Sequence, residues 1–284
     1  MRSGGTGLNA WRVEMCLPSV LRELAPKIYG EDLTEGLLIL EDLGSEPVVD
    51  GGTPRPERYA EAVRVLAKLH ANPLPPVLPV AEGTEHRLPP YDMEALLFEA
   101  ELMPEWYAPA IRNVSLSAEA RAAFVDLWRA ALQGAIPDRP TWTLRDYHSP
   151  NLIWLPEREG AARVGMIDFQ DAVRAHPSWD LHSLLQDARR DVSPALEAEA
   201  LDRYFALRPQ VDRAAFMADY AGLAALNEAP IIGIFARLIA RDGKPRYRQF
   251  LPRMWRHLNA NLDQPALAPV ARWFDRHVPV EVRA

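Results

Sequence analysis

Apolar residues recur at helical spacing in two segments of the chain. The apolar face of the first segment, residues 56–70, carries Tyr59, Val63, Leu66 and His70. The apolar face of the second segment, residues 118–133, carries Phe124, Leu127, Trp128 and Ala131. Ser117 precedes the second segment at the position where a side-chain oxygen caps a helix. The pattern predicts two amphipathic helices, in which these side chains, His70 included, pack rather than react.

A short apolar run, a polar turn and a second apolar run follow one another in residues 151–168. Residues 151–155, N-L-I-W-L, are typical of a strand, and residues 163–168, R-V-G-M-I-D, are typical of a returning strand. In an antiparallel hairpin the start of the first strand lies beside the end of the second. We therefore expect Asn151 and Asp168 to be neighbours, with Asp146 just before them on the incoming loop.

These three polar residues form a set that phosphoryl transfer uses. That reaction needs one carboxylate to orient the attacking hydroxyl, and an amide oxygen and a second carboxylate to hold Mg²⁺ against phosphates. The alternative is a polar loop with an incidental aspartate at the end of a strand, because Asp-x4-Asn alone is common. A rival metal-dependent phosphohydrolase would use as ligands His148, Asp168, His176, Asp180 and His182.

The loop L-R-D-Y-H-S-P-N resembles the HxDxxxxN loop of the kinase-like phosphotransferases, the superfamily of aminoglycoside phosphotransferases, with Leu144 in place of the histidine. The resemblance implies that Asp146 is the catalytic base and that Asn151 and Asp168 bind Mg²⁺. Three further phrases are similar to the bacterial anomeric N-acetylmuramate/N-acetylglucosamine kinases of cell-wall recycling: D-F-Q-D-A, H-P-S-W-D-L-H-S-L-L-Q-D-A-R-R-D-V and G-I-F-A-R-L-I-A-R-D-G-K-P. Those kinases phosphorylate the C1 hydroxyl of the sugar. The similarity covers roughly residues 36–273.

This resemblance implies an α+β, protein-kinase-like, two-lobed fold with a truncated small lobe. Residues 1–44 would be the remnant of the small amino-terminal lobe and the hinge, and residues 45–284 the mainly helical carboxyl-terminal lobe. The apolar run E-G-L-L-I-L-E-D-L would be the last small-lobe strand. We expect ATP's base to lie against Leu40, Glu41, Asp42 and Leu43. An ordinary buried strand and turn explains that segment equally well.

The sugar would be bound by the helices near the carboxyl terminus. Pro230 interrupts the apolar residues 219–240 and is expected to kink or end a helix. Asn227 and Glu228 beside it suit hydroxyl and acetamido groups, although a kinked core helix is the simpler interpretation. Arg237 or Arg241 would meet a muramate carboxylate, unless both form surface ion pairs. By the resemblance, Asp180 supports the catalytic loop through hydrogen bonds.

The amino terminus departs most from the family. The chain has three lysines, and none stands where a small-lobe strand would present it to phosphates: Lys27, Lys68 and Lys244. Residues 3–7, S-G-G-T-G, look like a phosphate-binding loop, but no strand leads into them, so we expect a flexible tail. Residues 11–24 would be the small-lobe helix, with Glu14 or Glu23 as its glutamate. A truncated chain, a misassigned start or a pseudokinase would explain this, and we expect weak or no turnover.

Composition narrows the remaining choices. The net charge of −7 does not favour binding to nucleic acid or to anionic membranes, which are negatively charged as well. Cys16 is the single cysteine, which excludes an internal disulfide and suits the cytoplasm. We also expect no apolar run of membrane-spanning length. A different acceptor, such as an aminoglycoside or an amino alcohol, remains the alternative to a sugar, although mixed arginine and acidic residues in the acceptor region favour a neutral or anionic substrate.

Overall fold

The computed structural model describes residues 22–32, 35, 37–74, 77–81, 84–137 and 140–283. The expected phosphate loop, most of the expected small-lobe helix and Glu14 lie outside these residues. The chain divides into two units, one of Met1–Pro90 with Arg139–Val211 and one of Tyr91–Asp138 with Asp212–Ala284. This division follows contacts within the folded chain, and the expected lobe boundary at residue 44 stays a prediction.

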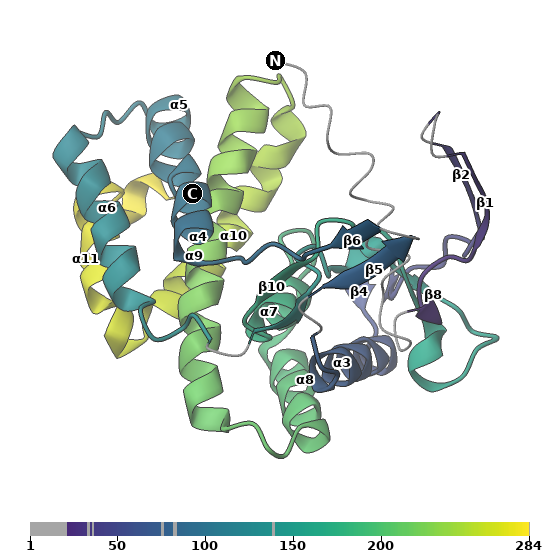
Figure 1. Ribbon diagram of the computed structural model, residues 1–284. Coiled ribbons are helices and arrows are strands. Elements are labelled where there is room, and N and C mark those ends of the chain that lie inside the picture. Colours follow the sequence, from purple (N-terminus) through teal and green to yellow (C-terminus); the bar gives the residue numbers. More distant parts are fainter. Residues whose placement is uncertain are drawn as a thin grey trace. The chain divides into compact units, whose positions relative to one another are not determined.

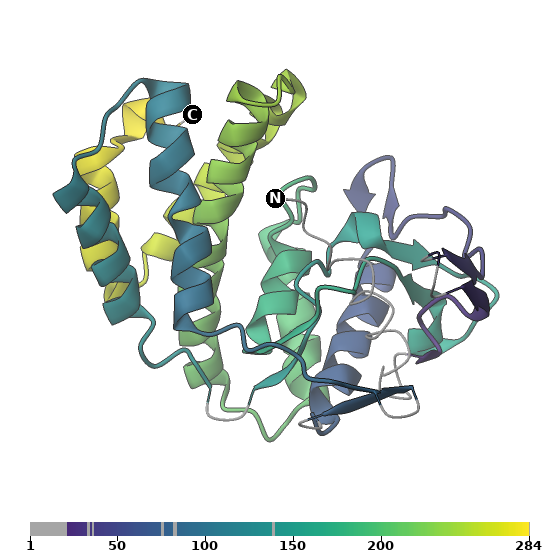
Figure 2. The same cartoon turned by 45° about the horizontal axis from the view of Figure 1, so that its top comes forward.

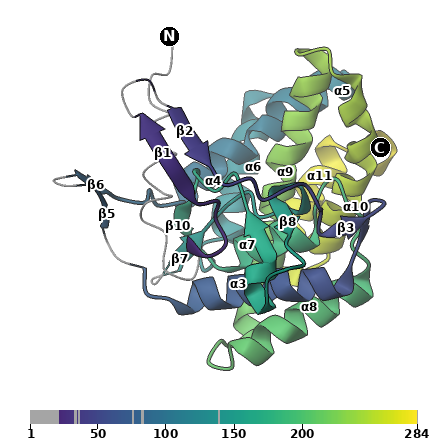
Figure 3. The same cartoon turned by 90° about the vertical axis from the view of Figure 1, so that its right-hand side faces the viewer.

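The first unit begins with short hairpins and one long helix. Strand β1 (Ile28–Asp32) pairs antiparallel with β2 (Leu37–Leu40), which falls within the expected apolar strand (Figure 3). The elements that follow are β3 (Val49–Asp50), β4 (Thr53–Pro54), α3 (Pro56–Ala71), β5 (Leu78–Ala81) and β6 (Thr84–His86). Strand β3 pairs with β4, and β5 pairs with β6.

The second stretch of this unit carries the expected catalytic hairpin. Its elements are β7 (Thr141–Thr143), η2 (Ser149–Asn151), β8 (Leu152–Trp154), η3 (Gly160–Arg163), β9 (Val164–Met166), β10 (Val173–Ala175), α7 (Ser178–Leu185) and α8 (Pro194–Leu207). Strand β8 pairs antiparallel with β9, and β7 pairs antiparallel with β10. The predicted hairpin is thereby confirmed, with strands shorter than expected.

Helix α3 forms because its apolar positions recur every three to four residues and Pro56 begins its first turn. All four residues expected on its inner face are buried: Tyr59, Val63, Leu66 and His70. Helix α8 lies alongside α3 (Figure 3), and the Arg208 guanidinium after α8 donates to the Ala67 carbonyl at 3.4 Å. The first predicted helix is confirmed as a packing element of this unit.

The second unit is helical. Its elements are α4 (Met93–Ala100), the π-helix η1 (Met103–Tyr107), α5 (Ala108–Arg112), α6 (Ala118–Ala131), α9 (Arg213–Ala240), η4 (Pro245–Phe250), α10 (Leu251–Leu262), η5 (Pro265–Leu267), α11 (Ala268–His277) and η6 (Val280–Val282) (Figure 1). Helix α6 is the second predicted helix. Ser117 Oγ accepts from the Ala120 amide at 3.2 Å, which confirms the cap. Phe124 and Trp128 are buried, whereas Leu127 and Ala131 are only half-buried.

Helix α9 corrects two expectations. It continues through Pro230, which is buried, so the expected end of the helix is wrong, whereas the expected kink stays a prediction. Figure 2 shows α9 as one continuous green helix. Its apolar window, with a mean hydropathy of 1.5, is long enough to cross a membrane by length and composition alone. The expectation that no apolar run reaches that length was therefore wrong. Of that window 61% is buried, and α9 packs against α10, η1 and α4 of its own unit, as a core helix does.

Gly233 allows α9 to approach η1 closely. A Cβ atom at Gly233 would lie 2.3 Å from the carbonyl carbon and oxygen of Leu102. Because backbone atoms cannot move aside as side chains do, Gly233→Ala is expected to lower the free energy of unfolding by about 2–3 kcal/mol. Gly222→Ala in the same helix is the control, since its Cβ would meet only the end of the Leu132 side chain, at 3.0 Å. Urea unfolding of both variants measures the difference, and equal midpoints would contradict this packing.

Candidate functional site

The hairpin brings Asn151 and Asp168 together, as the sequence predicted. The Asn151 side-chain amide lies 3.4 Å from an Asp168 carboxylate oxygen and donates to the Asp146 carbonyl at 3.0 Å. The Ile167 amide donates to the Asn151 carbonyl at 3.1 Å, which extends the strand pairing to the residue before Asp168. Asp146, Asn151 and Asp168 therefore gather at one end of the hairpin, on elements of a single unit.

The backbone is strained at two positions of this cluster. Arg145 has a φ of 67° and Asp168 a φ of 61°. Residues other than glycine rarely adopt this left-handed conformation, and it persists where the surrounding structure enforces it. Arg145 immediately precedes Asp146, so the strained turn sets the direction in which the Asp146 side chain leaves the loop. Strain of this kind clusters at functional sites.

The Asp146 carboxyl is a stronger base than an ordinary aspartate. Although Asp146 is exposed by its accessible surface, desolvation by surrounding protein groups raises its pKa. The charges of His148 and Arg145 oppose this rise in pKa, whereas Asp168 adds to it. A raised pKa suits a carboxylate that must accept a proton from a hydroxyl group.

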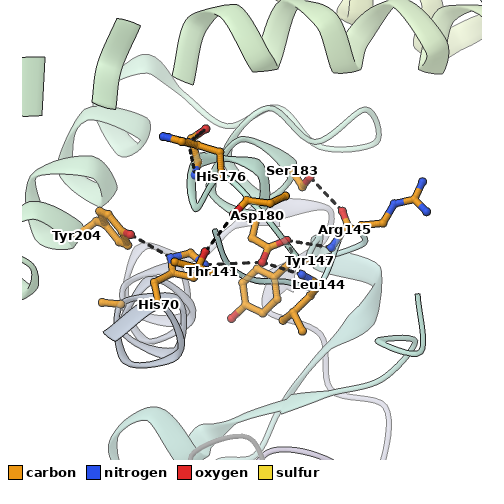
Figure 4. A network of polar contacts seen from close by, with 12 residues as sticks. His70, Thr141, Leu144, Arg145, Tyr147, His176, Asp180, Ser183 and Tyr204 are labelled. Atoms are coloured by element: carbon orange, nitrogen blue, oxygen red, sulfur yellow. Dashed lines mark hydrogen bonds and ion pairs between the residues drawn. The ribbon is translucent and has the colours of Figure 1, made fainter. Parts of the chain in front are cut away.

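Asp180 holds the loop that carries Asp146. Its fully buried carboxylate accepts from the Leu144 amide at 2.9 and 3.0 Å and from the Arg145 amide at 3.0 Å (Figure 4). His70 Nε2 lies 3.8 Å from the same carboxylate, and His70 Nδ1 is 2.9 Å from the Tyr204 hydroxyl. Burial lowers the pKa of His70, so it packs as a neutral ring. The hydrogen bonds are those expected of a residue that supports the catalytic loop.

The donor set at the end of the hairpin fits Mg²⁺. Mg²⁺ binds oxygen ligands and commonly uses one or two protein side chains together with substrate phosphates and water. Asn151 and Asp168 offer an amide oxygen and a carboxylate, and the Gln170 amide donates to Asp168 Oδ1. The rival set of five metal ligands is wrong on geometry. In the part of the chain that the structure describes, no three His, Cys, Asp or Glu side chains are placed to hold a metal ion.

Leu40 ends strand β2, and residues 41–43 follow the β1–β2 hairpin. The Glu41 amide donates to the Lys27 carbonyl at 2.8 Å, so this amide is not available to a nucleotide base. The Asp42 side chain accepts from the Gly44 amide at 2.8 Å, which forms a turn directly after the strand. Leu43 is buried against β9, where a Cβ atom at Gly165 would lie 2.9 Å from Leu43 Cδ1. Leu40 is exposed. The adenine-binding role of the four residues stays a prediction.

The expected sugar-binding residues all belong to the second unit. On α9, Asn227 is half-buried, and Glu228 is buried and accepts from the Asn261 amide at 3.1 Å. Arg241 forms a two-point ion pair with its neighbour Asp242, at 2.6 and 3.2 Å, which is the surface pairing foreseen as the alternative. Arg237 differs, because its Nε is buried and no partner for it occurs among the described residues. Arg237 is therefore the better candidate for an anionic group.

Sequence reasoning missed several residues around the site. Asp187 accepts from the Ser149 hydroxyl at 2.9 Å, and Arg158 donates to Glu41 at 3.0 Å. Gly165 has no side chain, and this allows Leu43 to pack closely against the hairpin. Each of these contacts joins positions far apart in the chain, so periodicity gives no signal for them. The phrase Q-D-A-R-R-D contained Asp187, but nothing in the sequence connects it with Ser149.

Comparison with known proteins identifies the family. The model of the phosphotransferase enzyme family matches residues 13–226, which is most of the chain. The chain belongs to this family. An N-acetylmuramate/N-acetylglucosamine kinase of Caulobacter vibrioides is 49% identical over 262 residues, covering 91% of this chain and 72% of that protein. A protein of the same name from Pseudomonas aeruginosa is 30% identical, covering 86% of this chain and 70% of the relative.

Solved structures show the same fold. A choline/ethanolamine kinase family protein from Mesorhizobium loti has a TM-score of 0.59 at 16% identity, covering 93% of this chain and 82% of that one. A GDP complex of aminoglycoside 2'-phosphotransferase-IIIa has a TM-score of 0.57 at 14% identity, covering 91% and 85%. The phosphotransferase is therefore a kinase with a protein-kinase-like, α+β fold, as the resemblance implied.

One histidine of α7, His182, is expected to make the stability of the protein depend on pH. Burial lowers the pKa of His182 to about 3, and His176 acts in the same direction. An unfolded histidine titrates at pH ~6.5, so the unfolded state binds the extra proton as the pH falls below that value. The contribution of neutral His182 to the free energy of unfolding is therefore fully present above the pKa of the unfolded histidine. It is lost progressively as the pH falls from there toward the pKa of the folded state. His182→Gln is expected to flatten the decline of the unfolding free energy by about 1.4 kcal/mol per pH unit.

Urea unfolding at several pH values between 7 and 4 measures this slope. His277→Gln is the control, because burial lowers the pKa of His277 without the large shift of His182. Equal slopes for the wild type and His182→Gln would contradict a neutral, buried His182.

Proposed function

We propose that this phosphotransferase transfers the γ-phosphoryl group of ATP to the C1 hydroxyl of N-acetylmuramate or N-acetylglucosamine in the cytoplasm. The observation that supports this choice of substrate is the 49% identity to an N-acetylmuramate/N-acetylglucosamine kinase across 91% of the chain. The gathering of Asp146, Asn151 and Asp168 at one end of the hairpin supports the reaction type. The sequence identity to this relative and the local geometry of the hairpin thus favour the same chemistry.

Asp146 orients the C1 hydroxyl and accepts its proton. The hydroxyl oxygen forms a bond to the γ-phosphorus while the bond from that phosphorus to the ADP oxygen breaks. Asn151 and Asp168 would hold Mg²⁺, which neutralises charge on the phosphates when bound. Residues 40–43 would receive the base of ATP, with the Glu41 amide excluded by its bond to Lys27. Positioning and electrostatics supply most of the catalysis in such reactions.

The test is ADP release by the purified chain with Mg²⁺ and ATP. The acceptors are N-acetylmuramate, N-acetylglucosamine, kanamycin, choline and none. Release that requires an N-acetylated sugar supports the proposal, and release with kanamycin or choline instead would replace it with the alternative acceptor. The weak turnover expected from the amino-terminal sequence stays a prediction that the same assay measures.

Arg237 provides a prediction about specificity. Arg237 is half-buried, and its buried Nε has no hydrogen-bond partner among the described residues, whereas the guanidinium of Arg241 is held by Asp242. A carboxylate bound to arginine contributes a charge-assisted hydrogen bond of ~1.5–3 kcal/mol. Arg237→Gln is therefore expected to raise the KM for N-acetylmuramate about tenfold. The KM for N-acetylglucosamine, which has no carboxylate, should stay the same.

Steady-state kinetics with both sugars measures this difference. Arg241→Gln is the matched control and should change neither KM by more than about twofold, as for an exposed ion pair. An equal rise in both KM values for Arg237→Gln would contradict a role in binding the carboxylate.

A further inference from the structure

Two buried carboxylates from residues 180–187 accept hydrogen bonds from the two ends of the catalytic loop. Asp180, in the first turn of α7, accepts from the amides of Leu144 and Arg145. Asp187, two residues after α7 ends, is 2% exposed and accepts from the Ser149 hydroxyl at 2.9 Å. The first contact holds the residues before Asp146, and the second holds the residues after it. The second contact joins two residues, Ser149 and Asp187, that lie outside the proposed catalytic and metal-binding set.

Ser149 and Asn151 belong to the same short turn. Ser149 begins the 3-10 turn η2, which ends at Asn151, and its carbonyl accepts from the amide of Leu152. The Asn151 amide donates to the His148 carbonyl at 2.9 Å. This turn is short and internally hydrogen-bonded, so a displacement of Ser149 is transmitted to the side chain of Asn151. The hydrogen bond from Ser149 to Asp187 thus influences the position of Asn151, the expected Mg²⁺ ligand.

Asp187 itself is fixed. Its other carboxylate oxygen accepts from the Arg189 amide at 2.7 Å, which closes a turn over residues 187–189. Tyr59 of α3 is also buried, and the negative charge of Asp187 adds to the desolvation that raises the pKa of the Tyr59 hydroxyl. The acceptor for Ser149 is therefore buried and held by the Arg189 amide.

A buried carboxylate is a poor device for stability alone. Removing a charge from water is costly, and apolar side chains of similar size stabilise a core as well or better. What a carboxylate provides is a strong, directional acceptor. Ser149 and Asp187 are both buried, so water does not take the place of either partner. These properties fit a contact that fixes geometry.

We propose that Asp187 is a positioning residue that acts through Ser149 to place Asn151 for metal binding. The inference rests on the proposed role of Asn151 as a Mg²⁺ ligand. It assigns to Asp187 no contact with the substrate, the nucleotide or the metal ion. Groups that orient metal ligands commonly change metal affinity about 10- to 100-fold when they are removed.

Hydrogen exchange tests the positioning without any turnover. In Ser149→Ala, the amides of residues 144–152 are expected to exchange about tenfold faster than in the wild type, because one hydrogen bond that anchors the loop is gone. Ser193→Ala is the matched control. It removes a serine that caps α8 by accepting from the Leu196 amide at 3.2 Å, so it costs stability of a similar size away from the loop. Unchanged loop exchange in Ser149→Ala would overturn the proposal.

Metal binding tests the consequence. Mn²⁺ is titrated by electron paramagnetic resonance in the presence of a non-hydrolysable ATP analogue. Ser149→Ala is expected to weaken Mn²⁺ binding about tenfold, and Asp187→Asn to weaken it in the same direction. The double variant should be no worse than the more affected single variant, because both act through one contact. Unchanged Mn²⁺ affinity, or additive losses, would overturn the positioning role.

The two proposals fail in different ways. Wild-type protein that binds no Mn²⁺ with the nucleotide analogue would refute the metal role of Asn151, and this inference with it. Wild-type protein that binds Mn²⁺ but transfers phosphate to no sugar would refute the proposed substrate and leave the positioning role standing.

Discussion

Asp146→Asn is expected to lower sugar-dependent ADP release about 10³-fold, without changing the folded structure. General base catalysis contributes ~10²–10⁴ in rate, and an asparagine side chain cannot accept the proton of the C1 hydroxyl. Desolvation raises the pKa of the Asp146 carboxyl, so the group that is lost accepts a proton more readily than an ordinary aspartate. Single-turnover kinetics with saturating ATP and sugar measures the chemical step directly.

Asp202→Asn is the control for this variant. Asp202 lies on the exposed side of α8, in the same unit, and the substitution makes the same change in charge. Its turnover should stay within about twofold of the wild type, as is usual for surface positions. An Asp146→Asn variant that keeps more than a tenth of wild-type turnover would show that another group accepts the proton.

Asp180→Ala is expected to lower the free energy of unfolding by about 3–5 kcal/mol and to abolish turnover. The fully buried carboxylate is the acceptor for the amides of Leu144 and Arg145, and its loss leaves two buried donors unsatisfied. Arg145 would also lose a contact that holds its left-handed backbone. The midpoint of thermal unfolding should fall by about 10 °C.

Asp212→Ala separates burial from hydrogen bonding. Asp212 also accepts from two backbone amides, those of Ala214 and Ala215, at 2.9 and 3.2 Å, but it is exposed. Water replaces the lost acceptor there, so a loss of about 1 kcal/mol is expected, as for other helix caps. Similar losses for the two variants would contradict the importance of burial at Asp180. Asp180→Asn, which keeps an acceptor oxygen, should fall between the wild type and Asp180→Ala.

The sequence was sufficient wherever short-range pattern decides structure. The hairpin of β8 and β9 follows from two apolar runs and a polar turn, and its antiparallel pairing alone makes Asn151 and Asp168 neighbours. Helical spacing similarly located α3 and α6 to within a few residues. The role of Asp180 came from resemblance, because its partners Leu144 and Arg145 are about 35 positions away.

Where tertiary packing decides, the sequence was insufficient. Pro230 predicted a kink or an end of the helix. Helix α9 does not end there, since packing against neighbouring helices of its unit outweighs the loss of one backbone hydrogen bond. Arg237 and Arg241 were equivalent in sequence, and the fold separates them by the ion pair of Arg241 with Asp242 and by the buried Nε of Arg237. Ser149 and Asp187 each looked like ordinary polar residues until the fold placed them in contact.

The identity of the phosphorylated product tests the central claim most directly. N-acetylglucosamine labelled with ¹³C at C1 is incubated with the chain, Mg²⁺ and ATP, and the product is observed by ¹³C and ³¹P nuclear magnetic resonance. The account predicts a new ³¹P signal coupled to the labelled C1 carbon, absent with Asp146→Asn. Phosphate on another sugar oxygen, or ADP and inorganic phosphate with the sugar unchanged, would contradict it.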